Sequence, residues 1–315
     1  MASNPRAVVL LGTTASGKSE LALTFAKKRG DVEIVSADSM CVYRGMNIAT
    51  AKPSIRDRND VRHHMVDTVD PCEDYSVARY QRDAMAAISD ITRRRHVPLV
   101  VGGTGLYYRA LVDSLAVPGT WPEIRSAIDA ITRRPGGLSS SYTMLAALDP
   151  LAASRVEPSN QRRIARALEV ILGSGRRFSS FGPGLDSYPM TQYDLIGISF
   201  DAATVDRRIE HRFRAWIGSG LVDEVIELID SSNGISRTAR QALGYREILE
   251  HLETGVPLDT AVETALRRTR SLARRQWKWF RRDPRIHWTP GGDATLDALA
   301  DAADRVIAPS KVAGL

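Results

Sequence analysis

Cysteine is scarce in this chain of 315 residues, which contains only Cys41 and Cys72. Two thiols cannot form the set of disulfides that stabilises small secreted proteins, so the sequence favours a reducing, cytoplasmic compartment. Long apolar runs are also missing. The sequence has no stretch of eighteen consecutive apolar residues, and we expect no membrane-spanning helix. The N-terminal stretch MASNPRAVVLLGTT lacks the layout of a signal peptide, because its apolar run leads directly into a glycine-rich motif.

Lysine is rare as well, although the chain has a net charge of +6 and 43 basic residues. A GC-rich genome explains most of the preference for arginine, but it does not explain why the arginines cluster. The clusters are QRRIAR (161–166), RQALGYRE (240–247) and RRTRSLARRQWKWFRR (267–282). Arginine binds phosphate groups through paired hydrogen bonds and stacks on bases, so these clusters fit an RNA-binding surface or a solvated surface without a partner. We expect the aromatic residues of the last cluster to lie in the core.

The most informative stretch is GTTASGKS, residues 12–19, which fits the pattern G-x-x-x-x-G-K-[ST]. The run AVVLL (7–11) before it predicts a buried strand, and residues 18–29 after it predict a helix ending at Gly30. This context is the one in which the motif surrounds phosphate groups with backbone N–H groups. Lys18 would add a cation, and the Ser19 hydroxyl could hold Mg²⁺. The expected diphosphate- or nucleotide-binding residues are Gly12, Thr13, Thr14, Ala15, Ser16, Gly17, Lys18 and Ser19.

Strands and helices alternate in the first part of the chain. Buried strands are predicted at 32–38, 97–103 and 193–200, a weaker strand at 63–69 and a helix at 75–95. Such alternation predicts an α/β fold with a doubly wound parallel sheet, in which 193–200 would be the last strand. Active residues of this fold lie at the carboxyl ends of the strands. We therefore expect residues 12–19, Asp38 and 102–104 to converge on one crevice.

The sequence pattern changes after about residue 119. Residues 120–189 carry no strand signal and include a helical stretch at 159–175, with Ser159 or Asn160 as its N-cap. We predict that 120–189 forms a mostly helical insertion in a catalytic core made of 1–119 and 190–315. Two long helical stretches, 203–231 and 259–283, would complete that core.

Three polar positions are candidates for chemistry. Asp38 follows a predicted strand, where it could orient Mg²⁺ or water, act as a general base, or simply form a turn. Thr104 begins a helix in GGTGLYYRAL (102–111), so it could cap the helix, face the active site, or do both. Arg208 and Arg212 share one helix face, for which solvated surface arginines are the default interpretation.

Some stretches are specific to one family: SADSMCVYRGM (36–46), ATAKP (49–53) and WFRRDPRIHW (279–288). Together with the phosphate loop, they resemble the bacterial tRNA dimethylallyltransferases, and the matching stretches cover nearly the whole chain in the family's order. Members of this family prenylate N6 of adenosine 37, next to the anticodon of tRNA. The resemblance implies that the loop holds the diphosphate of dimethylallyl diphosphate rather than ATP.

The resemblance also implies roles for single residues. Asp38 would hydrogen-bond or deprotonate the attacking amine, Thr104 matches the family's active-site threonine, and Arg212 would stabilise the leaving diphosphate. Mg²⁺ is the expected cofactor. The predicted tRNA-contacting residues are Asp38, Ser39, Met40, Cys41, Thr104, Arg125, Arg162, Arg163, Ile164, Ala165, Arg166, Gln241, Ala242, Leu243, Gly244, Tyr245 and Arg246.

Two positions depart from the family pattern. Many members have Gln in place of Cys41, whose thiol is a poor hydrogen-bond donor to RNA, and Ala49 replaces a usual glycine, so we expect no positive φ there. Two other functions remain open: a small-molecule or nucleoside kinase on the same core, and an RNA-binding switch protein without transferase activity. For the transferase, we expect a cytoplasmic monomer whose partners are tRNA and dimethylallyl diphosphate, without a membrane.

Overall fold

The computed structural model describes residues 6–182, 184–185, 187–199, 201–231 and 234–307. The chain divides into two compact units, Met1–Val112 with Met190–Leu315, and Asp113–Pro189. The second unit starts at Asp113, directly after the helix that ends at Val112, whereas the sequence predicted an insertion starting at 120. Among the helices of the described residues, none is both long and apolar enough to cross a membrane.

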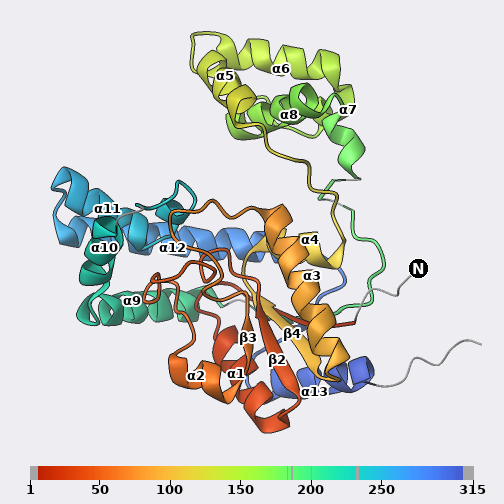
Figure 1. Cartoon of the computed structure of the whole chain (residues 1–315), viewed down its shortest axis with the longest axis vertical. Helices are drawn as coiled ribbons and strands as arrows, with labels where there is room; N and C mark the ends of the chain where they lie inside the picture. Colours follow the sequence, from red (N-terminus) through yellow and green to blue (C-terminus); the bar gives the residue numbers. More distant parts are fainter. Residues whose placement is uncertain (1–5, 183, 186, 200, 232–233, 308–315) are drawn as a thin grey trace, which may run out of the picture. The chain divides into compact units, whose positions relative to one another are not determined.

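Within the described residues, a six-stranded parallel sheet forms the centre of the first unit (Figure 1). Its order is β3 (His63–His64), β2 (Val32–Ser36), β4 (Val97–Gly102), β1 (Val8–Leu11), β5 (Asp194–Ile198) and β6 (His287–Thr289). The predicted parallel α/β sheet is confirmed. The expectation that 193–200 forms the last strand is wrong, because β6 pairs with the outer side of β5. A strand of three residues is too short to show a periodic pattern in the sequence.

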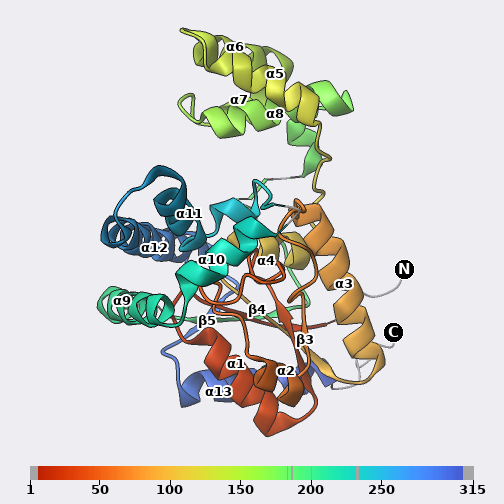
Figure 2. The ribbon, with the colours of Figure 1, turned by 60° about the vertical axis from the view of Figure 1, so that its left-hand side comes forward.

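Helices cover both faces of the sheet (Figures 1 and 2). On one face, α1 (Lys18–Arg29) and α13 (Asp293–Ile307) bury Phe25 and Leu299 against strand residues such as Leu10. On the other face lie α3 (Val77–Arg93) and α4 (Gly105–Val112), where the rings of Tyr80 and Tyr107 stack with their centroids 4.0 Å apart. The short α2 (Ile55–Asp60) precedes β3. Two apolar cores therefore fix the sheet, and its strand ends are held in place.

Four helices pack together beside the sheet (Figure 2). They are α9 (Ala202–Gly218), α10 (Leu221–Asp230), α11 (Tyr245–Thr254) and α12 (Leu258–Phe280). The predicted helical stretch 203–231 is broken at Gly220, whose φ of 90° does not fit a helix and favours glycine. Phe280 is fully buried, and the rings of Trp277 and Trp288 meet edge to face with centroids 4.8 Å apart. Of the aromatic residues in the last arginine cluster, Phe280 thus lies in the core as expected, whereas Trp277 and Trp279 are half-buried.

The second unit is helical. It contains α5 (Pro122–Thr132), α6 (Gly137–Leu148), α7 (Pro150–Ser154) and α8 (Gln161–Ser174), followed by the 3₁₀ helix η1 (Phe178–Phe181). Its own apolar core includes Ile128, Leu145, Ile164 and Leu168. The side chain of Asn160 accepts a hydrogen bond from the Arg163 N–H, so Asn160 is the N-cap of α8.

Candidate active site

The phosphate loop, residues 12–19, connects β1 to α1. Gly17 has a φ of 91°, where a side chain would strain the backbone, and Ala15 adopts a φ of 60°. The Lys18 Nζ donates to the Thr13 carbonyl over 3.2 Å, so its amine folds back over the loop. The loop therefore has the backbone conformation and the cation that phosphate binding requires.

Two side chains from distant helices hold the loop from outside. Arg208 of α9 donates to the carbonyls of Ser16, at 3.1 Å, and Ala15, at 3.4 Å. Gln276 of α12 accepts from the Thr14 N–H over 2.8 Å and donates to the Gly103 carbonyl over 2.8 Å. Sequence reasoning missed Gln276. Gln276 lies inside the last arginine cluster, and this position was its only sequence signal. The functional interpretation of that cluster rested on the charged and aromatic residues around Gln276.

Asp38 and Thr104 lie next to each other at the ends of β2 and β4. The Thr104 hydroxyl accepts from the Ser39 N–H over 3.3 Å, and the Asp38 Oδ1 accepts from the Met40 N–H over 2.8 Å. Asp38 therefore both forms a turn and faces the region at the strand ends. Among the described residues, the Asp38 Oδ2 has no hydrogen-bond partner, which leaves one carboxylate oxygen free to accept from a substrate.

Electrostatics links the turn to the loop. Burial lowers the pKa of Lys18, the negative charge of Asp38 opposes this change, and the positive charge of Arg212 adds to it. Burial, together with the charge of Arg208, also lowers the pKa of Arg212. Asp38 and Arg212 come from two other segments, yet the charges of both act on Lys18. The strand pattern predicted convergence of residues 12–19, Asp38 and 102–104, and it gave no sign that Arg212 of α9 lies near them.

A pocket of about 490 Å³ opens beside the loop. Its lining residues are Ala15, Gly17, Glu20, Arg207, Arg208, His211, Arg212 and Ala215. The Arg212 guanidinium lies 5.8 Å from the centre of the Trp216 ring. Arg208 and Arg212 thus face the phosphate loop, rather than serving only as the solvated surface arginines that their spacing suggested. An excess of cations around a phosphate loop suits an oxygen-rich anion.

The loop residues fit a Mg²⁺ ion that is bound mainly through its substrate. Within the described residues, the buried hydroxyls of Thr13 and Ser16 lack hydrogen-bond partners, as expected where an oxygen-rich ligand belongs. The Ser19 side chain is exposed at the start of α1. Over the same part of the chain, no group of three or more His, Cys, Asp or Glu side chains could hold a metal ion by itself. Mg²⁺ keeps water and substrate oxygens as ligands, so the Ser19 hydroxyl is the loop group that would hold it.

The predicted tRNA-contacting residues divide by exposure. Arg162, Arg163, Gln241 and Arg246 are exposed, whereas Ser39, Met40 and Leu243 are half-buried. The remaining side chains face inward or are paired. Arg125 pairs with Asp129 at 3.0 Å and Arg166 with Glu169 at 2.8 Å, while Ile164, Ala165, Ala242, Gly244 and Tyr245 are buried. Of the cluster 161–166, the side chains free to meet a phosphate backbone are therefore Arg162 and Arg163.

The two departures from the family pattern have structural explanations. Cys41 is only 7% exposed, and its Sγ donates to the Thr50 carbonyl over 3.6 Å. Burial raises the pKa of this thiol, which keeps it protonated. Ala49 has no positive φ, as expected. Its Cβ lies where a Cβ on Gly244 would come within 2.7 Å, so residue 244 must be the small partner in this contact.

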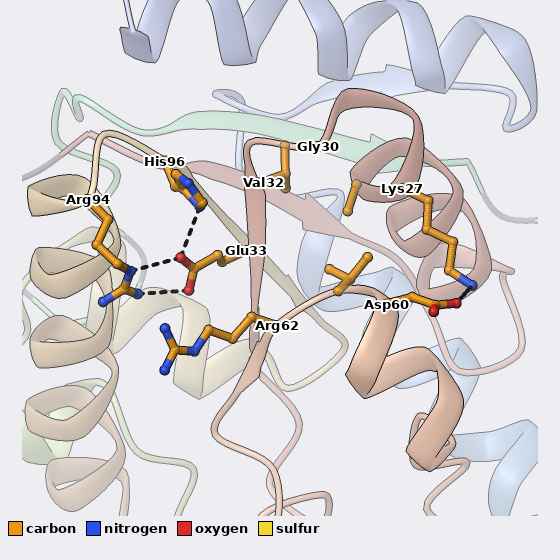
Figure 3. Close-up of a pocket in the computed structure, with 10 residues that line it drawn as sticks. Lys27, Gly30, Val32, Glu33, Asp60, Arg62, Arg94 and His96 are labelled. Atoms are coloured by element: carbon orange, nitrogen blue, oxygen red, sulfur yellow. Dashed lines mark hydrogen bonds and ion pairs between the residues drawn. The ribbon is translucent and has the colours of Figure 1, made fainter.

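A second pocket, of about 240 Å³, lies at the other end of the sheet (Figure 3). Glu33, near the start of β2, is buried there and accepts hydrogen bonds from Arg94, at 3.0 and 2.8 Å, and from His64, at 2.7 Å. His96, just before β4, lies 3.0 Å from the same carboxylate. These groups join β2, β3 and the end of α3. Because they lie at the amino ends of the strands, they are separate from the phosphate loop.

Comparison with known proteins identifies relatives of this chain in sequence and in structure. The family model described as IPP transferase matches residues 41–283. The tRNA dimethylallyltransferase of Acidothermus cellulolyticus is 45% identical over 302 residues, which cover 95% of this chain and 93% of the relative. The full-length tRNA isopentenylpyrophosphate transferase of Bacillus halodurans superposes with a TM-score of 0.67 at 31% identity, covering 96% of this chain and 98% of that structure.

A third similarity extends to eukaryotes. A eukaryotic dimethylallyltransferase acting on tRNA has a TM-score of 0.76 at 26% identity, covering 96% of this chain and 79% of that structure. The family match spans most of the first unit and the whole of the helical second unit. The chain therefore belongs to the IPP transferase family.

Proposed function

We propose that this protein transfers the dimethylallyl group of dimethylallyl diphosphate to N6 of adenosine 37 in tRNA, giving N6-isopentenyladenosine and diphosphate. The observation that carries this proposal is the position of Asp38 and Thr104 beside a phosphate loop. Thr104 is hydrogen-bonded to the turn that holds Asp38, and the charge of Asp38 acts on Lys18. A site for an acceptor amine thus adjoins a site for a diphosphate. The similarity to the tRNA dimethylallyltransferase of Acidothermus cellulolyticus supports the same substrates.

The reaction follows from this arrangement. The N6 amine attacks C1 of the dimethylallyl group, the C1–O bond breaks, and its electron pair leaves with the diphosphate. Lys18, the loop N–H groups and Arg212 stabilise the negative charge that builds up on the leaving group. Asp38 accepts the N6 proton through the oxygen that has no internal partner. Thr104 orients the turn and offers a hydroxyl at the same edge of the sheet.

The adenine must leave its stack to reach this site. A base in a single-stranded anticodon loop is less costly to extrude than a base in a duplex. Arg162 and Arg163 of the second unit are exposed and suit contacts to the tRNA backbone. Bound Mg²⁺, held by diphosphate oxygens with the Ser19 hydroxyl, would supply additional charge stabilisation. We further propose that the protein acts in the cytoplasm, where its tRNA partner is found, and that it acts as a monomer.

A small-molecule kinase is the alternative on the same core. A kinase would bind ATP at the loop and position an acceptor hydroxyl instead of an amine. However, β4 ends in Gly102 and carries no acid for Mg²⁺ at the usual place beside the loop. The carboxylate at the end of β2, Asp38, adjoins the acceptor turn. A carboxylate there can accept a proton from an amine or from a hydroxyl, so it is the missing acid on β4 that disfavours the kinase.

The acceptor is tested by incubating the protein with undermodified tRNA and dimethylallyl diphosphate, then digesting the tRNA to nucleosides for mass analysis. We expect a gain of one dimethylallyl group on a single adenosine next to the anticodon. A second tube contains ATP in place of the prenyl donor and free nucleosides in place of tRNA. If the tRNA in the first tube stayed unmodified and a nucleoside in the second tube became phosphorylated, the transferase proposal would be wrong and the kinase would be favoured.

A further inference from the structure

Helix α12 packs very closely against the turn between β4 and α4. A Cβ on Gly103 would come within 2.7 Å of the Gln276 Nε2, and a Cβ on Gly105 within 2.5 Å of the Trp279 Nε1. This leaves no room for a side chain at either glycine. The half-buried Gln276 therefore meets backbone groups directly.

Gln276 joins two segments that the proposed reaction keeps apart. Its Oε1 accepts from the Thr14 N–H of the phosphate loop, and its Nε2 donates to the Gly103 carbonyl, both over 2.8 Å. The next residue, Thr104, bonds to the N–H of Ser39, beside Asp38. A continuous chain of hydrogen bonds and backbone thus runs from the donor loop to the acceptor turn.

A side-chain amide makes both bonds without a charge. The Thr14 N–H needs an acceptor and the Gly103 carbonyl needs a donor, and the oxygen and NH₂ of the Gln276 amide supply both from one planar group. Asn is one methylene shorter and cannot span the same gap. A neutral group also adds no charge close to the diphosphate. The Thr14 N–H, held in this way, is directed to Gln276 and not to a phosphate oxygen.

We propose that Gln276 is a positioning residue that fixes the separation between the phosphate loop and the Asp38–Thr104 turn. This inference rests on the proposed transferase function, because the separation matters only when the loop holds the donor and the turn holds the acceptor. A misplacement of about 1 Å between reacting groups can cost roughly a hundredfold in rate, so two hydrogen bonds at this point have a large effect on the transfer step.

The test uses Gln276→Met, which keeps the chain length and loses both bonds, and Gln276→Glu, which keeps the shape and loses the bond to Gly103. Gln192→Met is the matched control, because Gln192 is exposed and its side chain has no bond within the described residues. We would measure the single-turnover rate at saturating donor and tRNA, the dissociation constant of dimethylallyl diphosphate, and hydrogen exchange of peptides covering 12–19 and 102–108.

We expect Gln276→Met to lower the saturated single-turnover rate about tenfold or more and to weaken donor binding several-fold. Exchange of the Thr14 amide should speed up while tRNA affinity stays unchanged. Gln276→Glu should lower the rate as well, and Gln192→Met should behave like the wild type. A general loss of fold would instead reduce the active fraction and leave the rate per active site unchanged.

Rates per active site that stay at the wild-type value in both Gln276 variants would overturn the proposal. Unchanged Thr14 exchange in Gln276→Met would overturn it as well, because the bond would then not protect the loop. If the wild type transfers no prenyl group, the proposed function fails, and the exchange measurement still decides whether Gln276 holds the two segments together.

Discussion

Asp38 and Thr104 are neighbours, but a carboxylate and a neutral hydroxyl serve different parts of the transfer. An anion at residue 38 helps the amine, whose N6 must lose a proton as the new bond forms, and it repels a bound diphosphate. Asp38→Ala should therefore lower turnover by roughly two to four powers of ten, the scale of a removed acid–base group, while diphosphate affinity holds or rises slightly. Thr104→Ala removes one hydrogen bond to Ser39 and should cost less.

Single-turnover transfer, measured beside equilibrium binding of dimethylallyl diphosphate and tRNA, distinguishes these roles. Asp38→Asn is a matched variant, because it keeps the shape and the turn-forming oxygen but cannot accept the proton. If Asp38→Ala abolishes diphosphate binding while chemistry survives at saturation, then Asp38 acts through Mg²⁺, and the kinase-like interpretation of this acid gains support.

Glu33 gives the fold a pH dependence. Burial raises the pKa of its carboxyl, but hydrogen bonds from Arg94 and His64 outweigh this effect, and the net pKa is lowered. A carboxyl with a lowered folded-state pKa stabilises the fold at pH values above its unfolded pKa and loses this contribution as pH falls through the folded pKa. The free energy of unfolding should therefore decrease as the pH falls below about 4.5, the ordinary value for this group.

Glu33→Gln should lower the free energy of unfolding by about 2 kcal/mol at neutral pH, because charge-assisted hydrogen bonds to a buried group are lost. The difference from the wild type should shrink as the pH falls. Asp60→Asn is the control, since Asp60 pairs with the partly exposed Lys27 and exposed pairs contribute little. Denaturant unfolding at several pH values measures both. If both substitutions lowered the free energy of unfolding equally, the buried cluster around Glu33 would stabilise the fold no more than an exposed ion pair does.

At the scale of elements, long periodic segments were predictable and tertiary pairings were not. Strands β1, β2 and β4 and helix α1 follow from their patterns, because a buried apolar run or a helix stop such as Gly30 is local information. Strand β6 is too short to be periodic and exists because β5 offers it an edge. The loop and the Asp38 turn were predictable from strand ends. Gln276 was not, since its two partners are 262 and 173 residues away in the chain.

Exposed arginines on one helix should account for part of the salt dependence of tRNA binding. Arg162 and Arg163 are exposed at the start of α8, and phosphate contacts of this kind release counterions. The double variant Arg162→Gln with Arg163→Gln neutralises both. It should reduce the slope of the logarithm of tRNA affinity against the logarithm of salt concentration by the contribution of up to about two phosphate contacts. The matched control is Arg56→Gln with Arg62→Gln, an equal change in net charge at two exposed residues around α2, near the amino ends of the strands.

Measuring the tRNA affinity of both double variants between low and moderate salt distinguishes direct phosphate contact from an effect of net charge. A slope that is the same for both double variants would show that charge at 162–163 acts only through the net charge of the protein. A lowered slope in the α8 variant alone supports direct contact by the second unit.

At the scale of the whole molecule, the chain combines a sheet-based unit that contains the phosphate loop with a helical unit that has its own core. The sequence predicted a helical insertion at 120–189, because strand signals stop after residue 119 and return at 193, whereas the second unit starts earlier, at Asp113. The family resemblance added the substrates. Composition and periodicity could not have supplied them, since the same phosphate loop and parallel sheet also serve kinases.

The central claim is that the phosphate loop holds a prenyl diphosphate and delivers its alkyl group to tRNA. The most direct test supplies the wild type and Lys18→Ala with tRNA and dimethylallyl diphosphate labelled in the alkyl group, next to a parallel reaction with γ-labelled ATP. The account predicts that the wild type moves the alkyl label to tRNA, that Lys18→Ala binds the donor more weakly and transfers more slowly, and that the ATP label stays off the tRNA. Equal donor affinity and equal transfer rates in the wild type and Lys18→Ala would contradict it.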